Sequence, residues 1–593
     1  MSILILTAIE KTWGRGKNLY FLGDWCCLYN RKEKWNNKKN KVQEYHWKDR
    51  DKFIKDSEYL EKFIDDLQPI LSEFLSKKHN VVFSKRAWRV ILGPWLVLMI
   101  PILWDRWESI RIALSSQQYD SINLIDTNSN DMIPDDYVNF TEMLNDHLWN
   151  NNFFKDILLF LDVENIKKYP YKNKNKNKNK NIFSIRLLIL NWINFLIKLF
   201  PLKEGIFFHT SGMSFGRYTL LSFRLGQAPL FHFLDFDKAY KNIKYDSIKV
   251  DCLRRHSLIP INGKLFEDFV YSKLLSYIPF SYLENFQAIK EETQKINFLG
   301  DIIFSSTSYF SSDFFKIWVA NQVDNEKKLL ISEHGSSIIP KCKIFKHDDK
   351  ISDYRVTWSI PINDKHIQLP PNKSITKLFK FQNYFRNTEK YLTLIGLEFP
   401  LYAHSCYSGP ISSIILDDYS QKVKFIDKLN KDVRGKLNIR PYTGYNNKGW
   451  QTKERYKDKY GISKISTNKK LQDDINTSKI IICTYPETTF SEAVSSGVPT
   501  ILLYLESSYE FETEFYDLIS ELKDKNIIFS DPLKAANHIN NIWDNPMGWW
   551  DSPEVISARN RFFDMCCKSS DNWLNEWSFF LKSTVRPNFR TAP

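Results

Sequence analysis

Residues 479–504, KIIICTYPETTFSEAVSSGVPTILLY, carry in succession the signals of a strand, a loop, a helix and a second strand. The apolar, β-branched run 479–483 predicts a buried strand, and 500–504 predicts the next one. Between them, the polar loop 484–489 leads into a helix from about Ser491, which a Gly-Val-Pro turn ends. A strand, a helix and another strand form the unit of a parallel sheet, so this stretch predicts an α/β fold.

The first turn of the predicted helix contains hydroxyl side chains suited to a phosphate. Backbone N–H groups at a helix N-terminus are unpaired, and the positive end of the helix dipole favours an anion. Thr488 and Thr489 can add hydroxyl donors there, and Glu492, about one turn further on, can hold vicinal ribose hydroxyls. The pattern indicates a nucleotide site; the alternative is that Thr488 is an ordinary N-cap and Glu492 a surface glutamate.

Strands and helices alternate through most of the remaining chain. Further predicted strands are 2–7, 19–22, 205–210, 302–305, 328–332, 391–397 and 436–440, and predicted helices are 59–77, 218–227, 312–323, 420–430 and 471–476. Such alternation predicts parallel sheets covered by helices, in two doubly wound halves, with a Pro-, Asn- and Lys-rich linker at 361–380 between them. We therefore expect an α/β domain over 1–365, a nucleotide-binding α/β domain over 366–548, and aromatic-rich helices over 549–593.

The composition excludes several classes of protein. Of the 593 residues, 43% are hydrophobic and 26% charged, which excludes a disordered, collagen-like or fibrous chain. The net charge of +14 comes from 83 Lys and Arg against 69 Asp and Glu, and the low-complexity loop 171–181, YKNKNKNKNKN, supplies five of those lysines. Because no aromatic or arginine residue is interleaved with the lysines of this loop, as in nucleic-acid-binding segments, we expect no nucleic-acid partner.

Cysteine use and two apolar stretches bear on the compartment. The 8 cysteines include two adjacent pairs and no CxxC spacing, so we expect reduced thiols and a cytoplasmic location. The stretch 90–104 is too short to span a bilayer, and 182–202 is interrupted by polar and charged residues. We interpret both as buried or amphipathic helices. Docking of 182–202 on a lipid surface stays open, because it follows the basic run.

A histidine follows the predicted strand 328–332 directly. His334 lies in a loop with Gly335 and Ser336, and the glycine allows the backbone to approach a ligand closely. A histidine there can donate to a phosphate or carboxylate, or act as a general acid or base. The alternative is a structural histidine. His334 is therefore a candidate catalytic residue, and Gly335 and Ser336 are candidate substrate contacts.

Two further candidate residues follow the strand 436–440. Arg440 ends this strand and Tyr442 comes two residues later. The guanidinium fork of arginine suits a phosphate or carboxylate, so both residues are predicted to contact substrate, with a surface loop as the alternative.

Carboxylates follow the first two predicted strands. Glu10 lies just beyond the strand 2–7, with Thr12 and Trp13 beside it, and Asp24 follows the second strand. A carboxylate on the acceptor side of a cleft can remove a proton from a sugar hydroxyl, so Glu10 is a candidate catalytic base. Thr12, Trp13 and Asp24 are candidate substrate contacts, although an exposed salt bridge is the simpler role for Asp24.

The segment SEAVSSGVPTI resembles the EA-x-x-x-G-x-P segment of GT-B glycosyltransferases. In that superfamily the glutamate usually holds the ribose of the donor nucleotide and the helix N-terminus its phosphate. Those roles would fall here to Glu492 and to Thr488 and Thr489, although TYPETT replaces the usual glycine-rich lead-in. The resemblance implies two Rossmann-type domains facing a central cleft, final helices that cross back to the first domain, and catalysis without a metal ion.

A second resemblance covers nearly the whole chain. It rests on ILTAIEKTW, FLGDWCCLYNRK, YHWKDR, WRVILGPWLVLMIPILWDRW, IFSSTSYFSSDFFKIWVA, EHGSSI and ISDYRVTWS. Together these segments resemble a family of transferases from O-antigen biosynthesis gene clusters. Related enzymes of capsule and lipopolysaccharide assembly have a Gln-His-Gly-Gly segment near the cleft. Here the segment is Glu333-His334-Gly335-Ser336, which keeps the His-Gly pair and departs on either side of it.

The resemblances imply a metal-independent glycosyltransferase of the cell envelope. Its co-substrate would be a nucleotide-sugar, with no other cofactor, and a CMP-ulosonate held by Arg440 or His334 is one hypothesis for it. The acceptor would be a glycan of a surface polysaccharide such as O-antigen, free or lipid-linked, reached from the cytoplasm or the cytoplasmic face of the inner membrane. The alternatives are a nucleotide-sugar epimerase of the same fold and a non-catalytic scaffold of a polysaccharide assembly complex.

Overall fold

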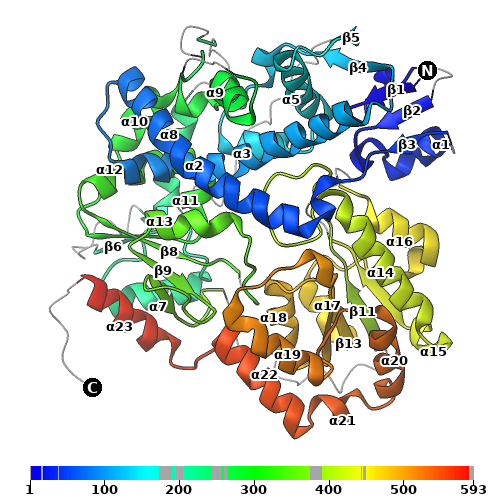
Figure 1. Cartoon of the computed structure of the whole chain (residues 1–593). Coiled ribbons are helices and arrows are strands. Elements are labelled where there is room, and N and C mark those ends of the chain that lie inside the picture. Colours follow the sequence, from blue (N-terminus) through cyan, green and yellow to red (C-terminus); the bar gives the residue numbers. More distant parts are fainter. Residues whose placement is uncertain are drawn as a thin grey trace.

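Three parallel sheets and the helices that cover them make up the computed structural model of the chain (Figure 1). The structure describes residues 2–14, 18–37, 39–171, 190, 192–194, 197, 205–243, 250–251, 255–259, 263–335, 337–373, 390–442, 444 and 449–585. In Figure 1 the first sheet lies at the upper right, the middle sheet at the left and the third sheet at the lower right. The prediction of an α/β fold with parallel sheets is confirmed.

The first sheet is built from the N-terminal residues. Its strands, in spatial order, are β3 (Lys41–Val42), β2 (Asn18–Phe21), β1 (Ser2–Ile5), β4 (Ser121–Asp126) and β5 (Ile166–Pro170). All neighbouring strands are parallel. The predicted strands 2–7 and 19–22 are therefore confirmed, while β4 and β5 were not expected from the sequence.

The middle sheet has its strands in chain order. From one edge to the other they are β10 (His366–Gln368), β9 (Tyr354–Thr357), β8 (Lys328–Ser332), β7 (Ile302–Ser305) and β6 (Ile206–His209). The linker interpretation of 361–380 is wrong at β10, because Ile367 pairs with Val356 and extends the sheet. Residues 374–380 of that stretch lie outside the described residues.

The third sheet carries the predicted nucleotide-binding stretch. Its spatial order is β12 (Leu437–Arg440), β11 (Tyr391–Ile395), β13 (Ser478–Cys483), β14 (Thr500–Leu503) and β15 (Ile528–Phe529). The direction of winding reverses between β11 and β13, and ligands of such sheets bind beyond the carboxyl ends of the strands at this reversal. The helix α18 (Thr488–Ser495) begins there, directly after β13.

Two long helices, α2 (Arg50–His79) and α3 (Lys85–Ser116), run through the molecule between the sheets (Figure 1). Asp49 and Ser84 cap their N-termini by accepting backbone N–H groups of the first turn. By length and composition α3 could cross a membrane, but 83% of its most apolar window is buried inside the protein. It packs against α2 and against α12 (Asp313–Asp324), as the prediction of a buried helix at 90–104 requires.

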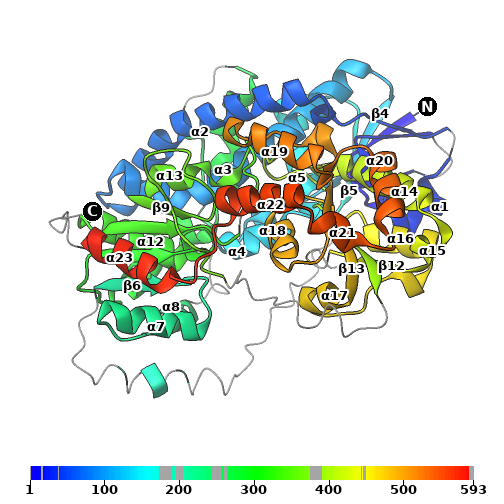
Figure 2. The same ribbon diagram turned by 90° about the horizontal axis from the view of Figure 1, so that it is seen from below.

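The chain after the third sheet returns to the middle sheet. Figure 2 shows the helix α23 (Trp573–Val585) beside α7 (Phe215–Leu225), on one side of the middle sheet. Trp577 and Leu581 of α23 are buried there against the strand residue Phe304. The range 1–365 thus comprises two sheets rather than one, and the domain bounds stay a prediction.

Candidate active site

A cavity of about 170 Å³ lies between the middle sheet and the third sheet. Loops at the carboxyl ends of β8 and β13 both contribute to its wall, as expected for ligand sites of parallel sheets. The lining residues are Tyr309, Glu333, His334, Gly335, Ser337, Ile338, Ile339, Pro340, Lys343, Arg355, His366, Tyr407, Pro486, Glu487 and Thr488. Three predicted site residues, from segments more than 150 positions apart in the chain, therefore meet at one cavity.

The loop after β8 touches the N-terminus of α18 directly. A Cβ atom placed on Gly335 would lie 2.2 Å from Oγ1 of Thr488 and 3.3 Å from its Cβ, so only glycine fits. Thr488 is the first residue of α18, whose unpaired backbone N–H groups and positive end favour an anion. His334, Gly335 and Thr488 are thus brought together as one site, while Ser336 lies outside the described residues.

The positive charge of Lys373 acts on both His334 and Glu492. Burial lowers the pKa of His334, and the Lys373 ammonium lowers it further, so its imidazole is neutral at physiological pH and can accept a proton. Burial raises the pKa of Glu492, and Lys373 opposes this rise. Glu492 is not among the residues that line the cavity, and the effect of Lys373 on both Glu492 and His334 places the two near one another. The hydroxyl of Thr489 lies 2.9 Å from the hydroxyl of Tyr485 and is also outside the cavity lining.

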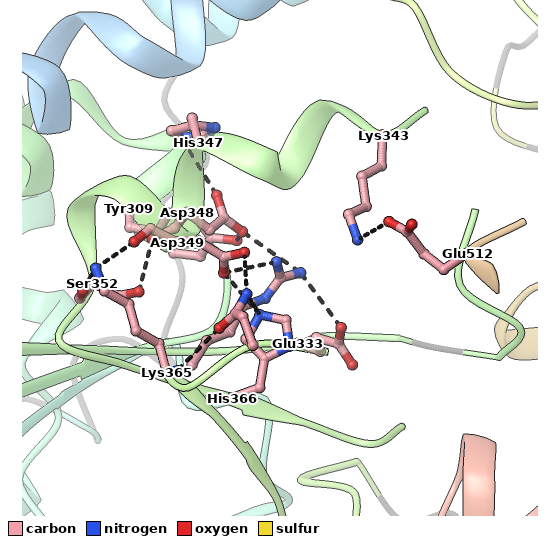
Figure 3. Close-up of polar contacts among 12 residues, drawn as sticks. Tyr309, Glu333, Lys343, His347, Asp348, Asp349, Ser352, Lys365, His366 and Glu512 are labelled. Carbon is pink, nitrogen blue, oxygen red and sulfur yellow. Dashed lines mark hydrogen bonds and ion pairs between the residues drawn. The ribbon is translucent and has the colours of Figure 1, made fainter. Parts of the chain in front are cut away.

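A buried arginine binds three carboxylates at the middle-sheet wall of the cavity. Arg355 on β9 lies 3.4 Å from a carboxylate oxygen of Glu333, 3.4 Å from Asp349 and 4.0 Å from Asp348. His366 on β10 lies 2.9 Å from Asp349. Figure 3 shows the side chains of Glu333, Asp348, Asp349 and His366 directed toward one another. We call these five residues the Arg355 cluster.

The two aspartates of the Arg355 cluster ionise very differently. Burial raises the pKa of Asp348 to about 7, although Arg355 and a hydrogen bond from the Tyr309 hydroxyl (2.8 Å) favour its charged form. Burial also acts on Asp349, but there His366 and Arg355 outweigh it and hold the pKa at about 2. Asp349 is therefore the permanent counter-charge of the cluster, and Asp348 changes its protonation near neutral pH.

The second cation of the cavity is also paired. Lys343 lies 3.2 Å from Glu512, and the two face each other to one side of the Arg355 cluster (Figure 3). Burial lowers the pKa of the Lys343 ammonium, which the charge of Glu512 partly restores. Within the part of the chain that the structure describes, no three His, Cys, Asp or Glu side chains are grouped to hold a metal ion.

The third-sheet wall contributes a carboxylate that the sequence interpretation left without a role. Glu487 immediately precedes α18 and accepts one hydrogen bond, from the Tyr407 hydroxyl at 3.0 Å. Burial raises its pKa, and the Tyr407 hydrogen bond opposes the rise. Its position in the loop TYPETT after a buried strand was the one local signal for Glu487, and Arg355, Lys343 and His366 carried no such signal.

The two predicted contacts after β12 lie elsewhere. The guanidinium of Arg440 pairs with Asp474 and donates to the backbone carbonyls of Lys470 (3.2 Å) and Asn468 (3.2 Å). The guanidinium of Arg440 is therefore bonded to the residues before α17 (Leu471–Thr477) and within it. These bonds account for its position outside the cavity lining. Tyr442 is 43% exposed and also lies outside the cavity lining, although the charge of Glu487 adds to burial in raising the pKa of its phenol and so places it near that lining residue.

The predicted contacts of the first sheet do not reach this cavity either. Glu10 pairs with Lys34 at 2.6 Å and with Arg31 at 3.3 Å, an ordinary surface arrangement. Thr12 and Trp13 are buried and bond to nearby backbone carbonyls. Burial raises the pKa of Asp24, which a hydrogen bond from Ser413 opposes. Asp24, which follows β2, therefore lies near Ser413, which follows β11 in the chain. Among the residues that the structure describes, the cavity is enclosed by the third sheet and the middle sheet, and not by the first sheet.

A protein family defined by sequence matches nearly the whole chain. Its description is LIC12162 family transferase, and the match covers residues 2–581. The chain belongs to the LIC12162 family of transferases. The matched range includes all three sheets and both walls of the cavity. A search of curated proteins finds no match to it.

Solved structures resemble the LIC12162 family transferase in fold. A Listeria monocytogenes protein designated a UDP-N-acetylglucosamine 2-epimerase aligns with a TM-score of 0.36 at 10% identity, over 66% of this chain and 99% of its own. MurG of Acinetobacter baumannii aligns with a TM-score of 0.32 at 11% identity, over 64% and 99%. WaaG, a glycosyltransferase involved in lipopolysaccharide biosynthesis, aligns with a TM-score of 0.25 at 8% identity, over 51% and 95%. Likenesses this distant carry no conclusion about the reaction.

Proposed function

We propose that this transferase is a glycosyltransferase that moves a sugar from a nucleotide-activated donor to a glycan acceptor of a surface polysaccharide such as O-antigen. The observation that carries the proposal is the contact between the His334-Gly335 loop and the N-terminus of α18 at one cavity. An anion-binding helix end and a neutral histidine on opposite walls are the two groups that sugar transfer from a phosphate requires.

Each group has a role in the proposed reaction. The donor phosphate binds at Thr488 and the α18 N-terminus, and Glu492 accepts hydrogen bonds from the ribose. The acceptor oxygen bonds to the anomeric carbon, the bond from that carbon to the phosphate oxygen breaks, and the phosphate leaves with the electron pair. The hydroxyl proton passes to His334, whose lowered pKa keeps it neutral beforehand. The ion-paired Glu10 is not used.

Replacing Glu492 by alanine tests the nucleotide part of the proposal. We expect nucleotide affinity to fall about ten-fold, because two hydrogen bonds to ribose are lost at about 0.5–1.5 kcal/mol each. Titration calorimetry of the full chain with UDP, GDP, dTDP and CMP measures this and identifies the base. Glu514→Ala, at an exposed carboxylate in the short 3-10 helix Thr513–Phe515, is the matched control and leaves affinity unchanged. Unchanged affinity in Glu492→Ala would remove the ribose assignment, and no binding of any nucleotide would favour the scaffold alternative.

The donor sugar is a separate question from the nucleotide. A CMP-ulosonate remains a hypothesis carried only by the resemblance, because Arg440, one of its two suggested partners, is held by Asp474 and backbone carbonyls. The other partner, His334, is neutral, and a neutral imidazole offers a weaker hold on a carboxylate than a guanidinium does.

We also propose that the protein acts in the cytoplasm and touches the inner membrane surface. The cysteines among the described residues are all unbridged and buried, which suits a reducing compartment. Phe215, Leu220 and Phe223 of α7 are 66%, 55% and 61% exposed, and Arg217 and Arg224 add positive charge to the same helix. An exposed apolar face suits a bilayer interface, whereas Arg217, which lies over the Trp573 ring, and Arg224, which donates to Asn575, are on the side of α7 that packs against α23.

The double change Phe215→Ser with Phe223→Ser tests this contact. We expect roughly ten-fold weaker co-sedimentation with vesicles of phosphatidylglycerol and phosphatidylethanolamine, because two large apolar side chains no longer enter the interface. Val82→Ser, at a 99% exposed valine between α2 and α3, serves as the control. Equal sedimentation of both variants with the parent protein would count against membrane contact through α7.

One observation favours the epimerase alternative. Glu333 and Glu487 line the cavity from its two walls, as acid and base carboxylates of an epimerase would. Glu333, however, is paired with Arg355 and accepts the backbone N–H of Trp358 at 3.0 Å. Incubation with labelled nucleotide-sugars and no acceptor separates the two reactions, because only an epimerase turns over.

A further inference from the structure

The positive charges of the cavity are all matched by carboxylates. Arg355 is surrounded by Glu333, Asp348 and Asp349, and Lys343 is paired with Glu512. Both cations are buried in these pairs, and breaking a buried pair to bind a different anion is costly. Neither Arg355 nor Lys343 is therefore available to a negatively charged sugar, and Lys373, whose charge acts on His334, is not among the described residues that line the cavity.

Glu487 is the lining carboxylate that lacks a cationic partner among the residues the structure describes. Its hydrogen bond comes from the neutral hydroxyl of Tyr407, and its side chain does not cap α18. Burial disfavours the charged form of Glu487, and a positively charged partner is the one that stabilises this form most. The uncompensated charge of the cavity is thus negative and lies on the third-sheet wall.

Tyrosines surround this carboxylate. The charge of Glu487 adds to burial in raising the pKa values of Tyr407, Tyr442, Tyr485 and Tyr509, so all four phenols lie near it. Phenol rings attract cations through their faces, and their hydroxyls hydrogen-bond to sugars. A carboxylate among tyrosines is the environment in which proteins bind organic ammonium groups.

The position of Glu487 relates this environment to the transferred sugar. It is the residue directly before Thr488, where the donor phosphate is placed in the proposed function. A sugar attached to that phosphate extends into the cavity and comes within reach of Glu487. We propose that the cavity selects a donor sugar bearing a protonated amino group, whose ammonium donates to the Glu487 carboxylate. This inference rests on the proposed function, because it takes the phosphate position from it.

Three methyl glycosides that differ in charge test the inference on the full chain. Methyl glucosaminide carries an ammonium, methyl glucoside a hydroxyl and methyl glucuronide a carboxylate. We expect saturation-transfer NMR titrations at pH 7 to give about ten-fold tighter binding of the glucosaminide than of the glucoside, the range of a charge-assisted hydrogen bond, and the weakest binding for the glucuronide. Equal binding of the first two, no binding of the glucosaminide, or tightest binding of the glucuronide would overturn the inference.

Glu487→Gln supplies the decisive comparison, since it keeps the shape of the side chain and removes its charge. The preference for the glucosaminide should disappear, while Glu514→Gln should retain it. Glu487→Asp, which keeps the charge on a shorter side chain, should retain a preference for the glucosaminide and covers the case in which Glu487→Gln fails to fold. A preference that persists in Glu487→Gln, or its loss in a folded Glu487→Asp variant, contradicts the assignment. The probes carry no nucleotide, so failure here with nucleotide binding that depends on Glu492 would overturn this inference alone.

Discussion

Replacing Gly335 by alanine is expected to reduce sugar transfer about one hundred-fold or more. The added Cβ would lie 2.2 Å from the Thr488 hydroxyl oxygen, so the His334 loop and the N-terminus of α18 must move apart. A shift of about 1 Å between a base and a phosphate site is enough for a loss of this size. The change should also lower the free energy of unfolding by about 1–3 kcal/mol, as overpacking usually does. Single-turnover transfer and urea unfolding measure the two effects.

Two variants show whether the loss comes from this contact. Gly216→Ala is the matched control, because a Cβ on that glycine of α7 meets nothing within 4 Å and should leave transfer unchanged. The double variant Gly335→Ala with Thr488→Ala removes the clashing oxygen and should recover most of the lost stability, a non-additive result that indicates direct contact. Gly335→Ala with the activity and stability of Gly216→Ala would mean that the two walls of the cavity do not meet at this glycine.

Local sequence periodicity predicted the elements on which the site is built. The strand that became β13 and the helix that became α18 follow from a short β-branched run and a polar loop, signals that lie within a few residues of one another. The loop after β8 was likewise placed at a strand end by the run 328–332. Position after a parallel strand was therefore enough to find His334, Gly335 and Thr488.

The partners of these residues could not be found in the same way. Arg355 lies inside β9, where alternation gives no reason to single out one polar residue, and its carboxylate partners come from two separate segments, the residue after β8 and the first turn of α13 (Asp348–Ile351). Glu487 stood in the quoted loop, but its burial depends on Tyr407, 80 positions away in the chain. Contacts of this kind are set by packing between sheets and leave no periodic signal.

The candidate residues of the first sheet, Glu10 and Asp24, do not line the cavity, and their roles stay predictions. Glu10 and Asp24 follow strands as predicted, and the rule that ligands bind at strand ends applies equally to all three sheets. Only tertiary packing decides which two sheets enclose a cavity. The apolar helix α3 joins the first and middle sheets into one core, so that the range 1–365 gave no compositional sign of its division.

Replacing Arg355 by leucine is expected to lower the free energy of unfolding by about 3–5 kcal/mol at pH 8, the usual loss when one partner of a buried ion pair is removed. Arg355 is 5% exposed and is the shared partner of Glu333, Asp348 and Asp349. Its removal leaves the charges of these carboxylates buried without compensation. Urea unfolding followed by tryptophan fluorescence measures the loss. Arg434→Leu, at an exposed arginine of α15 (Lys431–Gly435), should change stability by less than about 0.5 kcal/mol.

The pH dependence of this loss separates an electrostatic cause from a packing cause. Asp349, with a pKa of about 2, stabilises the folded protein above about pH 4 and loses that contribution as the pH falls toward 2. Asp348, with a pKa raised to about 7, favours the folded state most below about pH 4, and that advantage is lost as the pH rises through 7. Arg355 lowers both pKa values, so its removal raises them, and the folded variant takes up protons at a higher pH.

The loss of unfolding free energy in Arg355→Leu should therefore be largest at pH 8 and become smaller toward pH 4. Arg355→Lys, which keeps the charge and loses the fork, should show a smaller deficit with the same sign of slope. A deficit that is constant from pH 4 to pH 8 would show that Arg355 stabilises the wall of the cavity through its packing, and that its three carboxylates are held by other groups.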